Sequence, residues 1–173
     1  MARHSLDPYR SMTILKPPPL PLTGGCQCGA VRYTISGPPV VFYLCHCTEC
    51  QKQTSSAFGE SLRVQRADFE MEGPTKTFLR PISKGGHQTC TFCETCGTRL
   101  THQRPGYGDK LNVKAGTLDD ASWLVPAGHI WALSKQAHVA IRDDELAYPH
   151  QPETDADLEA RWQAMTPTWY PAS

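Results

Sequence analysis

Three cysteines stand within six residues in the segment Cys45-His-Cys-Thr-Glu-Cys50. Thiols at this spacing can bind one metal ion together. Zinc with three protein ligands keeps its fourth tetrahedral position for water or a substrate, which is the arrangement of a catalytic zinc. The segment therefore predicts a metal site with an open position at Cys45, Cys47 and Cys50.

Two further pairs of thiols lie far apart in the chain, at Cys26 and Cys28 and at Cys93 and Cys96. On an extended strand, residues two apart point to the same side, so we expect Cys26 and Cys28 to reach one metal, and Cys45 and Cys47 likewise to share one strand face. The second pair is a C-x-x-C motif, and Gly97 directly after it favours a tight turn around zinc. Two such arms predict a closed four-sulfur zinc site with a structural role.

The eighth cysteine, Cys90, leaves one alternative open. It could close the first site, giving four sulfurs at Cys45, Cys47, Cys50 and Cys90. Both zincs would then be structural, and the chain would be an interaction module. Either division predicts two zincs per chain, one structural and one catalytic in the division that we favour. Metal binding is favoured over disulfides because the amino terminus shows no export signal, and reduced thiols are the rule inside cells.

The elements that must position these thiols are mainly β. Short alternating patterns predict strands over residues 31–35, 40–44, 62–64, 68–71, 77–80, 111–113, 129–131 and 139–141. A short C-terminal helix capped by Thr154 or Asp155 would bury Leu158, Trp162 and Met165. We expect a proline-rich, disordered tail over residues 1–21, a zinc-binding domain over 22–150, and the helix and tail over 151–173.

Charge and hydropathy exclude several classes of partner. The chain has 17 basic and 17 acidic residues and no basic run, so we do not expect it to bind nucleic acid. No apolar stretch approaches the roughly 18 residues that span a bilayer. We therefore expect a soluble, cytoplasmic protein with a small-molecule partner; the sequence leaves its oligomeric state open.

Several motifs resemble the glutathione-dependent formaldehyde-activating enzyme family, whose domain is shared with centromere protein V. They are Gly25-Cys-Gln-Cys-Gly-Ala-Val-Arg-Tyr33, Cys45-His-Cys-Thr-Glu-Cys-Gln-Lys52, Ser55-Ser-Ala-Phe58, Phe92-Cys-Glu-Thr-Cys-Gly97, Gly116-Thr-Leu-Asp-Asp120 and His129-Ile-Trp131. The resemblance implies a zinc-stabilised β-tent fold of short antiparallel strands. It also implies a structural zinc on Cys26, Cys28, Cys93 and Cys96, and a catalytic zinc on Cys45, Cys47 and Cys50.

The activity that the resemblance implies is that of a carbon–sulfur lyase, which joins formaldehyde and glutathione into S-(hydroxymethyl)glutathione in the synthetic sense. Glu49 or His46 could move a proton, although a packing or supporting role is favoured over zinc ligation for His46. Ser55, Ser56 and the glycines of the loop at 83–86, Gly85 and Gly86, are candidates for ligand contacts, with a purely structural role as the alternative.

Two other functions fit the same motifs. A non-catalytic zinc domain would bind a protein partner, and a zinc enzyme of the same fold would act on another small metabolite. Cys90 stands where relatives often have arginine, and His138 where they often have tryptophan. Both differences suit a thiol or carbonyl substrate other than that of the named enzyme.

Overall fold

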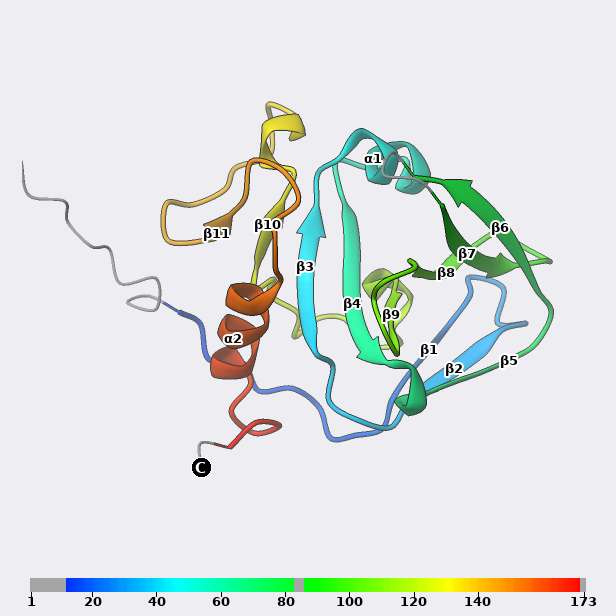
Figure 1. Cartoon of the computed structure of the whole chain (residues 1–173). Helices are drawn as coiled ribbons and strands as arrows, with labels where there is room; N and C mark the ends of the chain where they lie inside the picture. The colour runs from blue at the N-terminus through cyan, green and yellow to red at the C-terminus, as the bar shows by residue number, and fades with distance from the viewer. Residues whose placement is uncertain (1–11, 83–85, 172–173) are drawn as a thin grey trace, which may run out of the picture. The chain divides into compact units, whose positions relative to one another are not determined.

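The computed structural model describes residues 12–82 and 86–171, which form two compact units (Figure 1). The first unit combines residues 12–16, 43–59 and 125–171. The second combines residues 17–42, 60–82 and 86–124. Each predicted thiol cluster therefore lies within a single unit: Cys45, Cys47 and Cys50 in the first, and the two cysteine pairs in the second.

The first unit holds a small parallel sheet and both α-helices of the described chain. Its elements are the end of β3 (Val41–Cys45), α1 (Thr48–Thr54), β10 (Gly128–Ile130), a 3-10 turn (Ala132–Ser134), β11 (Leu146–Ala147) and α2 (Ala156–Met165). β10 pairs in parallel with β3 on one side and with β11 on the other. The expectation of antiparallel strands throughout is wrong here.

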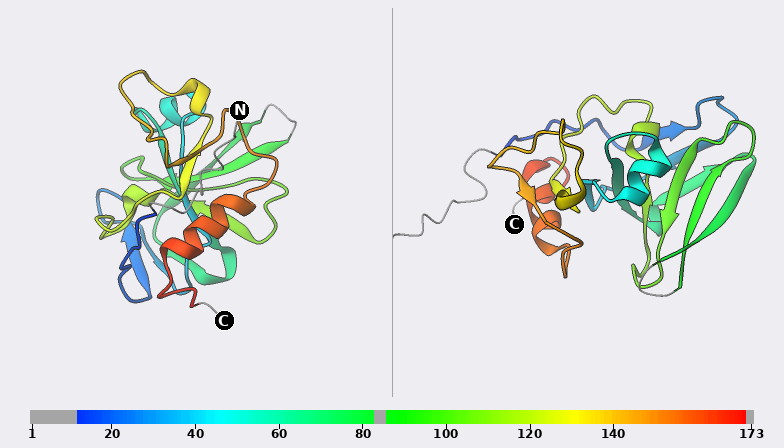
Figure 2. Two further views of the ribbon diagram at one scale, coloured as in Figure 1. Left: turned by 90° about the vertical axis from the view of Figure 1, so that its left-hand side faces the viewer. Right: turned by 90° about the horizontal axis from the view of Figure 1, so that it is seen from above.

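Helix α2 confirms the predicted C-terminal helix. Leu158, Trp162 and Met165 are all buried, as their spacing along one helical face predicts. Leu158 packs closely against β10: a Cβ added at Gly128 would lie only 2.7 Å from a methyl group of Leu158. Figure 2 shows the helix beside the parallel strands. Within the described part of the predicted tail, Leu15 is buried and its amide donates to the carbonyl of Met165 (2.7 Å), so this stretch is packed.

The second unit is built from antiparallel strands. Its elements are β1 (Leu22–Gly25), β2 (Arg32–Ile35), β4 (Gly59–Gln65, starting at the last residue of the first unit), a 3-10 turn (Arg66–Asp68), β5 (Phe69–Glu72), β6 (Thr75–Pro81), β7 (His87–Cys93), β8 (Arg99–Gln103), β9 (Lys110–Val113) and a 3-10 turn (Ala115–Thr117). Strands β1, β2 and β5 form one sheet, and β4, β9, β8, β7 and β6 follow one another in the other. This confirms a mainly β protein.

One predicted element is wrong. The pattern at 139–141 predicts a strand, but Val139 lies in a turn in which its amide donates to the carbonyl of Gln136 (3.0 Å). Alternation over three residues is too short to outweigh the turn that closes beside it. Helix α1 was not predicted, since its seven residues offer no apolar stripe and none of them is buried.

The two faces of the sheet differ in character along β4, β9, β8, β7 and β6. On one face, Thr89, Thr91, Thr101 and Gln103 line an open groove of about 810 Å³. On the other face, Arg63 of β4, Asn112 of β9 and His102 of β8 stand directly opposite one another in the strand register, and all three are buried. A row of buried polar side chains thus crosses the sheet.

His102 makes the stability of this row depend on pH. Burial lowers its pKa well below the ordinary value of 6.5, and Lys114, Arg99, Arg104 and Arg63 lower it further. As pH falls below 6.5, the unfolded chain binds a proton at His102 that the folded chain does not bind. The free energy of unfolding should therefore decrease by about 1.4 kcal/mol per pH unit from this group, until the folded pKa is reached.

We predict that His102→Gln reduces this slope between pH 6.5 and about pH 5, the range set by the ordinary histidine pKa. Chemical denaturation at several pH values measures it. His87→Gln, at an exposed position on β7, is the control and should keep the wild-type slope. A wild-type slope in the His102 variant would contradict a buried neutral imidazole.

Candidate metal centres

Four sulfurs of the second unit converge on one point. The Sγ atoms of Cys26, Cys28, Cys93 and Cys96 all lie within 4.8 Å of one another, with Cys26–Cys28 at 3.4 Å and Cys28–Cys93 at 3.8 Å. A zinc–sulfur distance of about 2.3 Å in a tetrahedron places the sulfurs about 3.8 Å apart. The cluster therefore has the spacing of a closed four-thiolate zinc site.

The first arm of this cluster is a turn, which corrects the predicted strand geometry. Cys26 follows β1, and the amide of Gly29 donates to the carbonyl of Cys26 (3.1 Å) with Gly29 in the left-handed region (φ 79°). The amide of Val31 donates to Cys26 Sγ (3.2 Å). An amide that donates to a sulfur stabilises its thiolate form. The turn therefore positions the Cys26 sulfur and also favours its ionised form.

The second arm confirms the tight turn predicted at Gly97. The amide of Gly97 donates to the carbonyl of Cys93 (3.0 Å), and its φ of 74° is one that glycine adopts without strain. The hydroxyl of Thr98 lies 3.2 Å from Cys96 Sγ and lowers the pKa of that thiol to about 5. This arm therefore favours the thiolate form of Cys96.

Three sulfurs of the first unit form the second cluster. Cys45 ends β3, Cys47 is the N-cap of α1, and Cys50 lies in the first turn of that helix. Their Sγ atoms lie within 4.8 Å of one another, with 3.4 Å between Cys45 and Cys47. The prediction that Cys45 and Cys47 share a strand face is wrong, because the chain leaves the strand at Cys45 and enters a helix at Cys47.

Helix capping explains why the chain turns at this point. The sulfur of Cys47 accepts a hydrogen bond from the amide of Cys50 (3.4 Å), as a side chain at an N-cap does for the third helical residue. The same bond places Cys50 one helical turn above Cys47. The spacing of Cys47 and Cys50 therefore both brings the two sulfurs together and starts the helix.

The thiols of this cluster perturb one another strongly. Hydrogen bonds from Cys45 and Cys50 lower the pKa of Cys47 to about 2, and the same contact with Cys47 raises the pKa of Cys45. Without a cation the three groups can therefore support one thiolate but not three. A bound divalent metal deprotonates its thiol ligands, so this donor set fits zinc. Among the described residues, no further His, Cys, Asp or Glu joins the set.

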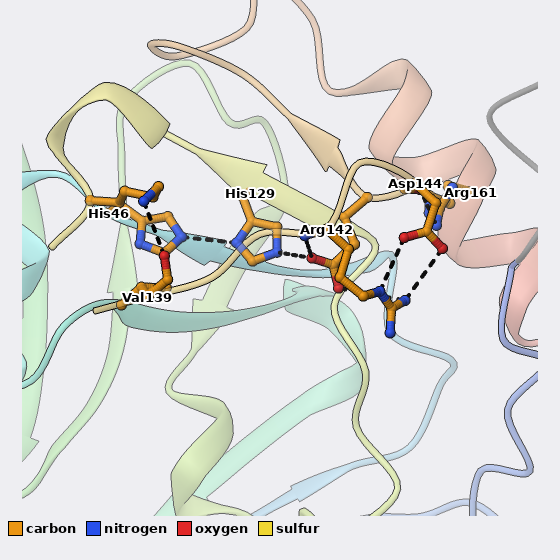
Figure 3. A network of polar contacts seen from close by, with 8 residues as sticks. His46, His129, Val139, Arg142, Asp144 and Arg161 are labelled. Atoms are coloured by element: carbon orange, nitrogen blue, oxygen red, sulfur yellow. Dashed lines mark hydrogen bonds and ion pairs between the residues drawn. The ribbon is translucent and has the colours of Figure 1, made fainter. Parts of the chain in front are cut away.

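A series of polar side chains in contact with one another begins at His46, between the candidate ligands Cys45 and Cys47. His46 is fully buried, and its Nε2 lies 2.9 Å from Nδ1 of His129 on β10 (Figure 3). His129 Nε2 lies 3.5 Å from Glu145, whose carboxylate accepts from the amide of Arg142 (2.9 Å). Burial lowers the pKa of His46 to about 4, so its imidazole is neutral at physiological pH.

Gln51 ties the loop that bears the thiols to the segment after β10. Its amide nitrogen donates to the carbonyls of His46 (2.6 Å) and Ser134 (2.8 Å), and its oxygen accepts from Gln136 (3.1 Å). Sequence reasoning gave no role to Gln51, Glu145 or the His129 side chain. The available signal was Gln51 at the end of the cysteine motif and His129 in the motif His129-Ile-Trp131.

The other predicted site residues occupy varied positions. Glu49 is exposed in the first turn of α1. Ser55 and Ser56 are exposed at the C-terminal end of the same helix, where both amides donate to the carbonyl of Gln51. Gly86 closes the β6–β7 connection by accepting from the amide of Ile82 (3.1 Å), while Gly85 lies outside the described residues.

Cys90 belongs to neither cluster in the described chain. It is fully buried on β7, where its sulfur lies 3.5 Å from both the side-chain nitrogen and the carbonyl oxygen of Gln88. The structure therefore favours the division into four and three sulfurs over a second four-sulfur site that contains Cys90.

Comparison with protein families assigns the chain that carries these clusters to a known family. Residues 21–134, which contain all seven clustered cysteines, match the model of the glutathione-dependent formaldehyde-activating enzyme family. The chain belongs to this family. The match confirms the resemblance seen in the sequence motifs; Glu145 and α2 lie beyond the matched segment.

Other comparisons add little to the family assignment. A crystal structure of a Rhodobacter sphaeroides protein is 20% identical, covers 56% of this chain and 87% of its own, and superposes with a TM-score of 0.44. No curated protein matches the sequence. In the described chain, no helix has the length and hydropathy needed to cross a membrane.

Gly59 lies close to Cys50, one of the three clustered thiols. A Cβ at residue 59 would lie 3.0 Å from Cys50 Cβ and 3.3 Å from its sulfur. Gly59→Val should displace Cys50 and weaken zinc binding at the three-sulfur cluster about tenfold or more. Titration with a chromophoric chelator measures the affinity.

Gly116→Val is the matched control, because a Cβ at residue 116 meets only Oε2 of Glu60, at 3.3 Å, and no thiol. The control should bind zinc like the wild type. Unchanged zinc affinity in the Gly59 variant would show that the position of Cys50 is not critical.

The four-sulfur cluster should be essential for folding of its unit. Cys93→Ser removes one ligand from a closed site, and binding energy at such sites is folding energy. We expect loss of one zinc and of β-sheet circular dichroism, whereas Cys90→Ser should retain both. A folded Cys93 variant that keeps two zincs would refute the structural role.

Proposed function

We propose that this protein is a zinc-dependent carbon–sulfur lyase of the S-(hydroxymethyl)glutathione synthase type, with glutathione and formaldehyde as its reactants. The three-sulfur cluster carries this proposal. It holds Cys45, Cys47 and Cys50 at zinc spacing, and no fourth ligand joins it within the described residues. A closed site would have no position for a reactant.

Bound zinc would offer its fourth position to a thiol or a carbonyl oxygen and supply Lewis acidity there. In the synthetic direction, the thiol loses its proton, a sulfur lone pair forms the carbon–sulfur bond, and the π electrons of the carbonyl move to oxygen, which takes up the proton. In the lyase direction the hydroxyl loses that proton, the carbonyl forms again, and the bonding pair returns to sulfur. No other reactant is needed.

The cluster itself has a buried and an accessible side. Cys45 is buried, while Cys47 and Cys50 are half-buried. A reactant therefore approaches beside Cys47 and Cys50, from the side where α1 begins. Cys45 anchors the cluster to β3, which pairs with β10 at Ile130.

Proton transfer is assigned to Glu49 in this proposal. Its carboxyl group is exposed on the helical turn that joins Cys47 to Cys50, so it can exchange protons with both solvent and a reactant. His46 is fully buried and directed at His129, so we assign it a positioning role for the thiol loop. Ser55, Ser56, Gly85 and Gly86 remain proposed ligand contacts.

The test is the rate at which the enzyme interconverts formaldehyde plus glutathione with S-(hydroxymethyl)glutathione, measured by NMR exchange spectroscopy against the spontaneous reaction. Wild type should accelerate the exchange. Cys47→Ser should lower the acceleration about 100-fold or more while keeping the fold, because the Lewis acid is lost.

Cys90→Ser is the matched thiol control and should retain the activity. Two inert zincs and no acceleration would favour a binding module. Two zincs with one exchangeable, again without acceleration, would favour an enzyme that acts on a different small metabolite.

A further inference from the structure

Three side chains of the first unit come from neighbouring strands of its parallel sheet. His46 directly follows β3, His129 is the middle residue of β10, and Glu145 directly precedes β11. β10 pairs in parallel with β3 on one side and with β11 on the other. The strand order therefore places His129 between the other two, and Figure 3 shows the imidazoles of His46 and His129 facing each other.

The two histidines share a hydrogen bond between neutral imidazoles. Nε2 of His46 lies 2.9 Å from Nδ1 of His129, and the ring planes differ by only 18°. Burial lowers the pKa of both rings, that of His46 to about 4, so neither ring is charged at neutral pH. A neutral imidazole has a single N–H, so one ring must donate and the other must accept. The tautomers of the two rings are therefore coupled.

The carboxylate of Glu145 distinguishes the two possible directions of this hydrogen bond. Its Oε2 lies 3.5 Å from Nε2 of His129. This separation is long for a hydrogen bond, so the carboxylate acts on the ring mainly through its charge. A negative charge favours an N–H over a lone pair on the nitrogen that faces it. With its N–H on Nε2, His129 can only accept at Nδ1, and His46 must donate from Nε2.

Contacts within its own turn fix the carboxylate of Glu145. Its Oε2 accepts from the amide of Arg142 (2.9 Å), and the guanidinium of Arg142 lies 3.7 Å from Oε1. The same guanidinium donates to Asp144 (3.0 Å). Only 19% of the Glu145 side chain is exposed. Solvent and salt therefore screen its charge less than they screen a surface carboxylate.

His46 connects this arrangement to the thiols. It stands between Cys45 and Cys47 in the chain, and its side chain is fully buried. Its amide donates to the carbonyl of Ile130 (3.0 Å), and its carbonyl accepts from the side chain of Gln51 (2.6 Å). A fixed imidazole adds a third restraint on the backbone between the two thiols. Residues that orient metal ligands in this way affect metal affinity without touching the metal.

We propose that Glu145 is a positioning residue of the three-sulfur cluster. Its charge, acting through His129, keeps the N–H of His46 on Nε2 and so holds the segment that carries Cys45 and Cys47 in its metal-binding conformation. Glu145 lies beyond the segment that matches the family model, so family membership assigns it no role. The inference rests on the proposed zinc site of this cluster but not on the reaction proposed for it.

The first measurement is proton–nitrogen correlation NMR of the histidine rings in the zinc-loaded full chain at neutral pH, with signals assigned by single histidine-to-glutamine variants. His46 and His129 should both carry their N–H on Nε2. Glu145→Leu removes the carboxylate, and both rings should then also populate the other tautomer. Asp143→Leu makes a similar change at an exposed position of the same turn and should leave both rings as in the wild type.

The second measurement is the zinc affinity of the three-sulfur cluster, by competition with a chromophoric chelator. Glu145→Leu should weaken it about tenfold, as loss of a residue that supports a metal ligand does. Glu145→Gln keeps an oxygen for the Arg142 amide and for His129, so it should recover most of the affinity and the wild-type tautomers. Asp143→Leu should bind zinc like the wild type. A residue that only stabilised the fold would change Tm without changing either tautomer.

Three results would each overturn the proposal. The first is an N–H on Nδ1 of either ring in the wild type, a result that does not require any variant to fold. The others are wild-type tautomers in Glu145→Leu, and a zinc affinity of that variant equal to that of Asp143→Leu. Tautomers and zinc affinities as expected, together with no acceleration of the reaction by the wild type, would contradict the lyase proposal alone.

Discussion

Mutual electrostatic perturbation among closely spaced thiols is the constraint on which the rest of this structure depends. Seven sulfurs lie in two groups with sulfur–sulfur spacings of 3.4–3.8 Å for the closest pairs. At that distance thiols share protons, and full ionisation of either group requires a cation. Each unit of the fold contains one such group.

The two clusters differ in how the backbone supports them. In the four-sulfur cluster, a glycine turn shapes each arm, and the Val31 amide and the Thr98 hydroxyl are directed at the sulfurs of Cys26 and Cys96. In the three-sulfur cluster, a helix begins at Cys47, and Gln51 and His46 fix the loop from behind through β10 and the segment after it. This difference agrees with a structural role for the first cluster and a chemical role for the second.

Local spacing predicted well which thiols lie together, because C-x-C and C-x-x-C motifs bring thiols close whatever the surrounding chain does. It failed for backbone conformation at Cys26 and at Cys47, where a turn and a helix cap replace the expected strands. Partners distant in sequence could not be predicted from local patterns either. His46 meets His129 across 83 residues, and Arg63 meets Asn112 across 49. Those contacts depend on strand register, which local sequence leaves unspecified.

The measurement that tests the account most directly is the zinc content of the purified chain before and after mild chelation. We expect two zincs per chain, of which one leaves readily from the three-sulfur cluster and one is retained by the four-sulfur cluster. Two zincs that resist chelation equally, or a single zinc per chain in protein saturated with the metal, would contradict it.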